Sequence, residues 1–125
     1  MSIVGVGTDI VSVDRFTISA ESQRLLSRVF TAAEREYCLA QVLPAQHFAA
    51  RFAAKEATIK AVCSILPGLL VTQVEVHKAE GSRSPQVRLI SGPMLPDNIL
   101  LHISISHSET SATAFAVAED IGLKE

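Results

Sequence analysis

The chain has 125 residues, of which 48% are hydrophobic and 19% charged, so a single domain spanning residues 1–125 is expected and two are excluded. This apolar content also excludes a mainly disordered chain, because folding buries enough apolar surface to offset the loss of conformational entropy. Eleven Lys and Arg against thirteen Asp and Glu give a net charge of −2, which provides no general attraction to nucleic acid or to an anionic membrane.

The N-terminal third predicts a strand followed by helices. The β-branched and glycine-containing run at residues 3–7 suits a buried strand whose backbone is closely approached by another element. Apolar residues return every three or four positions from Ile10 to Arg28, which predicts a helix with a break at Ser19–Ser22. Thr31, with Glu34 three residues later, predicts a capped helix start.

The rest of the chain predicts one long helix and two pairs of strands. Residues 47–66 carry apolar side chains on one face and charges on the other, and Pro67-Gly68 supply the stop. Alternation at 71–77 and 86–90 predicts a hairpin, and residues 101–118 predict a second pair of strands around a serine-rich turn. This order favours an α+β domain with a largely antiparallel sheet packed on its helices.

Two features bear on the cellular compartment. Cys38 and Cys63 are the only cysteines and have no metal-ligand spacing, so we expect a reducing, cytoplasmic environment. The N-terminal segment has no basic residue and Asp9 interrupts its apolar stretch, which is not typical of a signal peptide. No apolar run approaches the roughly 18 residues of a membrane span.

Asp9 is the first candidate site residue. The segment Gly5–Ile10 matches only part of a dinucleotide-binding fingerprint, because Ile10 stands where the third glycine belongs and no βαβ unit follows. A carboxylate at the end of a strand and before a helix is either an N-cap or a metal ligand, and for Asp9 alone the cap is favoured.

Four charged side chains interrupt the alanine-rich part of the long helix, and we place them on one side of it: Arg51, Lys55, Glu56 and Lys60. The spacing of Glu56 and Lys60 allows a surface ion pair contributing about 0.2–0.5 kcal/mol. Alternatively, the small alanines would let a phosphorylated ligand lie on the helix, with Glu56 on a divalent metal and the cations on phosphate oxygens. Solvated charged faces are the commoner case.

His107 lies at the predicted end of a strand, and we place it on the face opposite Ile103 and Ile105. Its neighbour Ser106 does not make a catalytic triad, because triad roles depend on geometry in space. The other histidines receive no role: His47, His77 and His102.

Basic residues outnumber acidic residues by seven to four between positions 15 and 60. A locally cationic helical surface suits an anionic partner, either an acidic protein or a phosphate-bearing ligand.

Five blocks span nearly the whole chain: Gly7–Val11, Phe30-Thr31 with Glu34, Arg51–Ala57 with Lys60-Ala61, Val74–Val76 and Ser104–Ser108. In order and spacing they resemble the holo-acyl-carrier-protein synthases, the small stand-alone 4′-phosphopantetheinyl transferases. The resemblance implies that family's fold. It also implies transfer of the phosphopantetheine group of coenzyme A to a serine of apo acyl carrier protein, with release of adenosine 3′,5′-bisphosphate.

The same resemblance implies roles for the residues on the long helix. Asp9 and Glu56 match the family's Mg²⁺ ligands and, with Lys60 at the pyrophosphate, are the expected catalytic residues. The positions around the nucleotide and its 3′-phosphate are matched by Arg51, Lys55, Lys60 and His107. Glu56, Asp9 and a metal-bound water are all candidates for the base that removes the serine proton.

The resemblance further implies partners. Members of the family are homotrimers with active sites between subunits, and His107 is expected to come from the neighbouring subunit. Arg15 matches a family arginine that contacts the acidic recognition helix of the carrier protein, and Arg24 and Arg28 extend this patch.

The chain departs from the family pattern at three places. Ser12 stands where Glu is common, and Gln73 stands where Asp is common. The usual Gly-Lys-Pro turn is replaced by the longer Gly81–Pro85, in which Arg83 would supply the lysine's charge.

Two other functions stay open. One is a non-catalytic trimeric binding module on the same scaffold, against which the presence of Asp9, Glu56 and Lys60 argues. The other is a different Mg²⁺-dependent phosphoryl-transfer or hydrolytic enzyme. Coenzyme A dependence would distinguish the phosphopantetheinyl transferase from such an enzyme.

Overall fold

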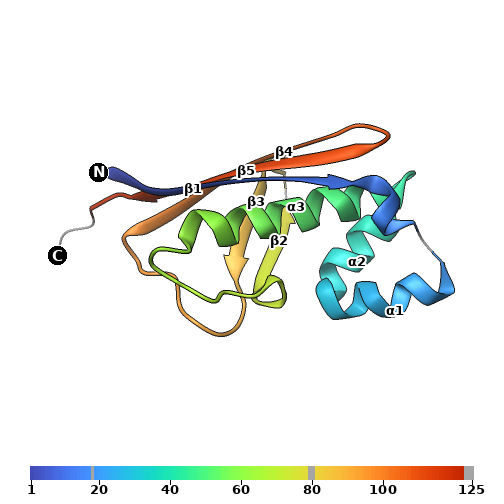
Figure 1. Cartoon of the computed structure of the whole chain (residues 1–125), viewed down its shortest axis with the longest axis horizontal. Helices are drawn as coiled ribbons and strands as arrows, with labels where there is room; N and C mark the ends of the chain where they lie inside the picture. Colours follow the sequence, from blue (N-terminus) through green and yellow to red (C-terminus); the bar gives the residue numbers. More distant parts are fainter. Residues whose placement is uncertain (18, 79–80, 123–125) are drawn as a thin grey trace.

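The structure, a computed structural model, describes residues 1–17, 19–78 and 81–122. A three-stranded sheet lies over the long helix α3, and the β2–β3 hairpin with helices α1 and α2 lies on the other side of that helix (Figure 1). The elements in chain order are β1 (Ser2–Ser12), η1 (Val13–Phe16), α1 (Ala20–Val29), α2 (Ala32–Leu39), α3 (Pro44–Val62), η2 (Val71–Gln73), β2 (Val74–Lys78), β3 (Pro85–Leu89), β4 (Ile99–His107) and β5 (Ser111–Asp120). This confirms the predicted α+β class.

The three-stranded sheet is antiparallel, in the order β1-β5-β4. Its inner face presents the four alternate alanines of β5 between Ala112 and Ala118, each at most 3% exposed. Since alanine is small, α3 packs close to the strands. The hairpin predicted at 71–77 and 86–90 is present as β2 and β3, and the pair of strands predicted at 101–118 is present as β4 and β5, both antiparallel.

Strand β1 touches the backbone of α3 directly. A Cβ atom on Gly5 would lie 1.8 Å from the carbonyl oxygen of Ala61, and one on Gly7 would lie 2.0 Å from that of Ala57. Neither position therefore accepts a side chain without moving the strand away from the helix. The predicted close approach to residues 3–7 is confirmed, and the approaching element is α3.

The predicted helix from Ile10 was wrong at its start. Ile10 and Val11 continue β1 and pair with Thr113 and Ala112 of β5, because a sheet partner overrides a spacing that also suits a helix. Helix α1 begins only at Ala20, inside the predicted break at Ser19–Ser22.

The capped start of α2 is confirmed. Thr31 Oγ1 accepts a hydrogen bond from the Glu34 backbone N–H at 3.2 Å, and Glu34 Oε1 accepts one from the Thr31 N–H at 2.8 Å. This is the reciprocal capping box that the sequence indicated.

Helix α3 differs from the prediction in its ends and in its burial. It begins at Pro44, since proline fits the first turn, and ends at Val62, four residues before the expected end. Its charged residues do not form one solvated face, because the sheet covers one side of the helix and α2 and β2 cover the other. Arg51 and Lys55 are buried as a result, at 4% and 0% exposed. Among the described residues, no helix combines the length and apolar character needed to span a bilayer.

Candidate active site

Asp9 and Lys60 meet where β1 crosses α3. The Lys60 ammonium lies 3.4 Å from Asp9 Oδ1 and donates a 2.9 Å hydrogen bond to the carbonyl oxygen of Thr8. The side chain of Asp9 is 18% exposed and that of Lys60 is 52% exposed. The ion pair is therefore open to solvent on one side and accessible to a ligand.

Glu56 lies on the same part of α3. Gly5 of β1 lies against Ala61 of α3, and Gly7 lies against Ala57, so the strand runs antiparallel to the helix. Two strand residues cover about 6.8 Å, slightly more than one helical turn of about 5.4 Å, so Asp9 comes beside the turn that carries Glu56. We call Asp9, Glu56 and Lys60 the carboxylate site.

Two sequence interpretations are corrected at this site. Asp9 is not a helix cap, because it lies inside β1 and Ser12 occupies the N-cap position of η1. The surface ion pair expected between Glu56 and Lys60 is not among the ion pairs of the described residues, in which Lys60 pairs with Asp9.

Lys55 forms a second, fully buried ion pair. Its ammonium lies 2.9 Å from Glu34 Oε1, with both side chains 0% exposed, and also donates to the carbonyl oxygens of Val71 and Val74. The other Glu34 oxygen accepts the N–H of Val76 at 2.7 Å. The pair thus joins α2, α3 and β2.

Burial lowers the pKa of Lys55, and the charge and hydrogen bond of Glu34 act in the opposite direction. All three ammonium hydrogens have acceptors in the fold. The expected role of Lys55 as a nucleotide contact therefore disagrees with this geometry, which makes it a structural residue.

Arg51 belongs to a third group, a cavity of about 160 Å³ that we call the cationic cavity. Its lining includes Tyr37, Arg51, Lys78, Arg83, Ile105 and His107. The Arg51 guanidinium stacks 3.9 Å from the centroid of the Tyr37 ring, and its Nε atom is buried without a hydrogen-bond partner among the described residues. An unpaired buried donor of a cation favours an anionic ligand here.

His107 lies on the inner face of β4. Because strand side chains alternate, His107 shares a face with Ile105, and both line the cationic cavity. The prediction that it faces away from Ile103 and Ile105 was wrong. His107 Nδ1 lies 3.0 Å from Gln46 Oε1 at the start of α3.

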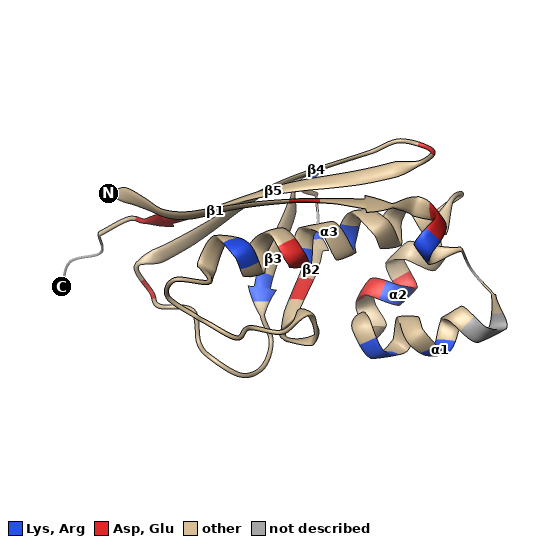
Figure 2. Cartoon of the chain, in the orientation of Figure 1, with Lys and Arg blue, Asp and Glu red and all other residues tan. Residues whose placement is uncertain are grey.

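The charged residues of α3 do not share one side. Successive helix residues are about 100° apart, so Arg51 and Glu56 point about 140° apart around the axis. Figure 2 shows the acidic and basic bands distributed along the helix. The carboxylate site therefore faces β1, whereas Arg51 faces α2 and the end of β4.

Arg15 and Arg28 lie at the rim of an apolar groove of about 320 Å³ between η1 and α1. Phe16, Leu25 and Phe52 line the groove, and the Arg15 guanidinium lies 5.2 Å from the centroid of the Phe52 ring. Arg24 is exposed on α1 and does not line the groove among the residues described there. A role of the three arginines in carrier-protein binding stays a prediction.

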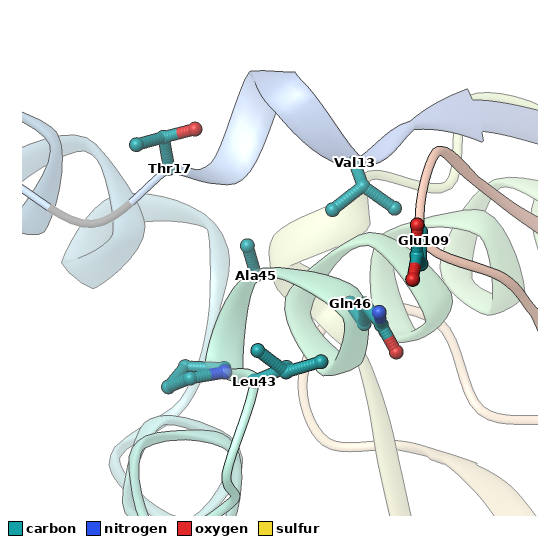
Figure 3. A pocket seen from close by; sticks show the side chains of 7 residues that line it. Val13, Thr17, Leu43, Ala45, Gln46 and Glu109 are labelled. Atoms are coloured by element: carbon teal, nitrogen blue, oxygen red, sulfur yellow. The ribbon is translucent and has the colours of Figure 1, made fainter.

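A further cavity of about 420 Å³ lies beside the first turn of α3 and contains none of the predicted site residues (Figure 3). Its lining is apolar apart from Thr17, Gln46 and Glu109.

Comparison with known proteins decides between the open functions. Residues 5–118 match the family described as the 4′-phosphopantetheinyl transferase superfamily. The chain belongs to this superfamily. The resemblance suggested by the five sequence blocks is confirmed, and the non-catalytic module and the unrelated phosphoryl-transfer enzyme are no longer needed to explain them.

Relatives of this transferase include two chlamydial proteins named holo-[acyl-carrier-protein] synthase. That of Chlamydia caviae is 41% identical over 122 residues, which covers 94% of this chain and 98% of the relative. That of Protochlamydia amoebophila is 41% identical over 118 residues, which covers 91% and 96%. These relatives identify the chain as an enzyme of the holo-[acyl-carrier-protein] synthase type.

Solved structures of two further synthases share the fold of this transferase. The Neisseria meningitidis enzyme superimposes with a TM-score of 0.75 at 31% identity, covering 94% of this chain and 98% of that one. The Bacillus anthracis enzyme, solved in complex with CoA (3′,5′-ADP), gives a TM-score of 0.74 at 29% identity, covering 96% and 99%.

Sequence reasoning missed the contacts that three residues of this transferase make with predicted site residues. Tyr37 stacks on Arg51, Glu34 neutralises Lys55, and the His47 ring lies 5.0 Å from the His107 ring. Glu34 was noted as a capping residue and as part of a resemblance block, but no sequence signal indicated that its second oxygen accepts the Val76 N–H of β2. A lone histidine such as His47 also gives no periodic or motif signal.

Proposed function

We propose that this transferase moves the 4′-phosphopantetheine group from coenzyme A to a serine hydroxyl of an apo acyl carrier protein. The serine oxygen forms a bond to the phosphorus that bears pantetheine. The pyrophosphate P–O bond breaks, and adenosine 3′,5′-bisphosphate leaves. The observation that carries the proposal is the pairing of an accessible carboxylate site with a separate cationic cavity on one alanine-rich helix.

Asp9 and Glu56 fit a Mg²⁺ ion. Within the described residues no group of three or more His, Cys, Asp or Glu side chains is placed to hold a metal, so a fully protein-made cage is not available. Mg²⁺ needs no such cage, because it keeps several waters and is commonly held by one or two carboxylates together with substrate phosphates. When bound, it would neutralise charge that builds on the leaving pyrophosphate.

Lys60 is the cation of the same site. Its ammonium is held by Asp9 and by the Thr8 carbonyl and remains half exposed. It is therefore oriented toward the region where a pyrophosphate held at Asp9 and Glu56 would lie, and it would donate to a phosphate oxygen.

The cationic cavity is assigned to the nucleotide and its 3′-phosphate. Arg51 offers an unpaired buried donor, and Lys78, Arg83 and His107 add positive or protonatable groups around the same space. Arg83 lies in the Gly81–Pro85 segment, as expected for the residue that replaces the lysine of the family's turn.

We propose a homotrimer with active sites between subunits. The carboxylate site and the cationic cavity face different sides of α3, so one cofactor molecule would bridge the carboxylate site of one subunit and the cavity of another. The outer face of the three-stranded sheet is also uncovered and apolar, with Ile3 57%, Ile10 70% and Phe115 49% exposed. An apolar patch of this kind is typical of a protein interface.

Complementation between inactive chains tests the shared site. Glu56→Gln removes the carboxylate site and Arg51→Ala removes the cationic cavity, so each variant alone should be inactive. After subunits exchange, random mixing should restore about a quarter of wild-type activity, because one interface in four combines two intact halves. A mixture as inactive as its components would place both halves of each site in one chain.

The interface itself is tested by light scattering during size-exclusion chromatography. Ile10→Glu should convert the trimer to monomers, because it places a carboxylate in the apolar contact. Leu39→Glu, at an exposed apolar residue of α2, is the matched control and should leave the trimer intact. A trimer that tolerates Ile10→Glu would exclude this sheet face as the interface.

The docking surface for the carrier protein is assigned to Arg15, Arg28 and the apolar groove between them, with Arg24 nearby on α1. Two cations beside an apolar groove suit an acidic amphipathic helix.

Intact-mass spectrometry tests the reaction. An apo acyl carrier protein incubated with the transferase, coenzyme A and Mg²⁺ should gain the mass of one phosphopantetheine group. The gain should disappear with EDTA and return with excess Mg²⁺. No gain with several carrier proteins, together with no coenzyme A binding by calorimetry, would overturn the proposal.

A further inference from the structure

Two histidines stack at the wall of the cationic cavity. The His47 ring on α3 lies 5.0 Å from the His107 ring on β4, with the planes at 62°. Its other neighbour is the Tyr37 ring, at 6.0 Å and 70°. His107 lines the cavity, whereas His47 is half-buried and is not among the residues described as lining it. Within the described part of the chain, the ring contacts of His47 toward the cavity are with His107 and Tyr37.

His47 lies in a field of positive charge. Burial lowers its pKa, and His107, Arg51 and Lys78 lower it further. Arg83 lines the same cavity from the β2–β3 segment. The elements around His47 carry further titratable groups. On α2 these are Glu34, Glu36 and Cys38, and Glu34 is paired with Lys55 of α3. The others are Glu75 and His77 on β2 and Glu109 after β4.

Most of these acids are already neutralised or lie elsewhere. Glu34 pairs with Lys55 and Glu75 pairs with Arg88, while Glu109 lines a different cavity. Burial raises the pKa of the Cys38 thiol to about 12, so this group stays uncharged at neutral pH. An anion that enters the cationic cavity would thus bring a negative charge close to His47 and His107.

We infer that His47 is a positioning residue for the cationic cavity and that the His47–His107 pair takes up a proton when a phosphate group binds there. The inference rests on the proposed function. Gln46 Oε1 accepts from His107 Nδ1 and so holds the ring with Nε2 as the remaining protonation site. The His47 ring packs against the same ring in an edge-to-face arrangement.

The sign of the coupling follows from the charges. A bound phosphate offsets the positive charges that, together with burial, lower the pKa of His47, so the pKa of His47 is higher in the complex than in the free enzyme. Affinity for phosphate is then greatest below the free-state pKa and is lost as pH rises through the pKa of the complex. A rise of one pKa unit corresponds to about a tenfold gain in affinity at low pH.

Calorimetric titration with adenosine 3′,5′-bisphosphate measures the proton directly. Titrations at about pH 7, near the histidine pKa range, in two buffers with different ionisation heats should show uptake of a fraction of a proton by the wild type. Adenosine 5′-diphosphate, which lacks the 3′-phosphate, should show clearly less uptake.

His47→Phe keeps an aromatic edge against His107 but cannot accept a proton. We expect it to reduce the proton uptake at least about twofold and to flatten the pH dependence of the nucleotide Kd. The KM for coenzyme A should rise while kcat changes little. His47→Gln is the second variant in case phenylalanine disturbs folding, and His77→Gln on β2 is the control, expected to behave as wild type.

The outcomes separate the inference from the proposed function. Equal proton uptake by wild type and His47→Phe, or no uptake by the wild type, overturns the inference while transfer measured by mass spectrometry still stands. Failure of the wild type both to bind the nucleotide and to modify a carrier protein overturns the two together.

Discussion

Two neighbouring residues of α3 have opposite surroundings. Lys55 is fully buried, and every hydrogen of its ammonium is used by Glu34 and two backbone carbonyls. Glu56 is only half-buried, and the nearby Asp9–Lys60 pair is open to solvent. A buried ion pair with all its hydrogen bonds made has no free group for a ligand, whereas an accessible one can exchange partners. We therefore expect these two adjacent charges to have separate roles, a structural one for Lys55 and a chemical one for Glu56.

The largest effect on activity is expected from a substitution of Glu56. Glu56→Gln removes the carboxylate charge but keeps the shape, so we expect transfer to fall by about 10³-fold or more, corresponding to several kcal/mol of lost charge stabilisation. Intact-mass kinetics measure the loss, and circular dichroism should show an unchanged fold. Glu36→Gln, at an exposed carboxylate of α2, is the control. Wild-type turnover of Glu56→Gln at saturating Mg²⁺ would contradict the metal assignment.

The structural side should respond in stability. Lys55→Met leaves the Glu34 carboxylate buried without a counter-charge and should lower the free energy of unfolding by about 3–5 kcal/mol. Lys60→Met breaks an exposed pair and should lower it by at most about 1 kcal/mol. Urea denaturation measures both.

If the single variant Lys55→Met does not fold, the double variant Glu34→Gln/Lys55→Met tests the structural role of Lys55 instead. Gln removes the unpaired charge and keeps one oxygen, which can accept the N–H of either Thr31 or Val76, so part of the lost stability should return. A Lys55→Met variant as stable as wild type but defective in coenzyme A binding would restore the nucleotide-contact role.

A smaller effect is expected at the rim of the apolar groove. Arg15→Ala should raise the KM for the carrier protein about three- to tenfold and leave the KM for coenzyme A unchanged, because a rim charge acts mainly on encounter with an acidic partner. The loss should shrink as salt is added. An unchanged carrier-protein KM would limit Arg15 to its packing on Phe52.

The smallest effect concerns the ion pair of Arg88 and Glu75, which are 2.6 Å apart. The Arg88 side chain is 59% exposed, so this pair is more exposed than Glu34–Lys55. Burial alone would raise the pKa of Glu75, but hydrogen bonds from Thr31 and Arg88 and the Arg88 charge lower it overall. The resulting stability is present above the unfolded-state pKa and is lost as pH falls through the folded-state value. Arg88→Met should cost about 0.5–1 kcal/mol at neutral pH and less in acid, as followed by urea midpoints. An equal loss at both pH values would mean that packing, rather than charge, is removed.

The sequence was informative where a pattern is local. The Thr31–Glu34 capping box, the β2–β3 hairpin and the antiparallel last pair of strands each depend on residues close together in the chain, and each is present. Asp9 was singled out as a carboxylate at the end of a strand and Glu56 as a charge among alanines, and the family resemblance supplied the expected role of both.

The sequence was misleading where burial depends on distant elements. Helix periodicity cannot show that α3 is covered on two sides, so Lys55 was placed with the exposed charges although Glu34 neutralises it. The same limit applies to His47, whose environment is built by α2, β2 and β4. Ile10 was assigned to a helix because its strand partner, Thr113, lies about a hundred positions away.

The contact of Gly5 and Gly7 with the carbonyl oxygens of α3 has a consequence for protein engineering. Even a methyl group at either position would separate β1 from the helix, and Asp9 would then move away from Glu56. Libraries that aim at new acceptor proteins should therefore leave these two glycines fixed. Their diversity belongs on α1 and η1, where side chains change the proposed docking surface without altering the spacing of the carboxylates.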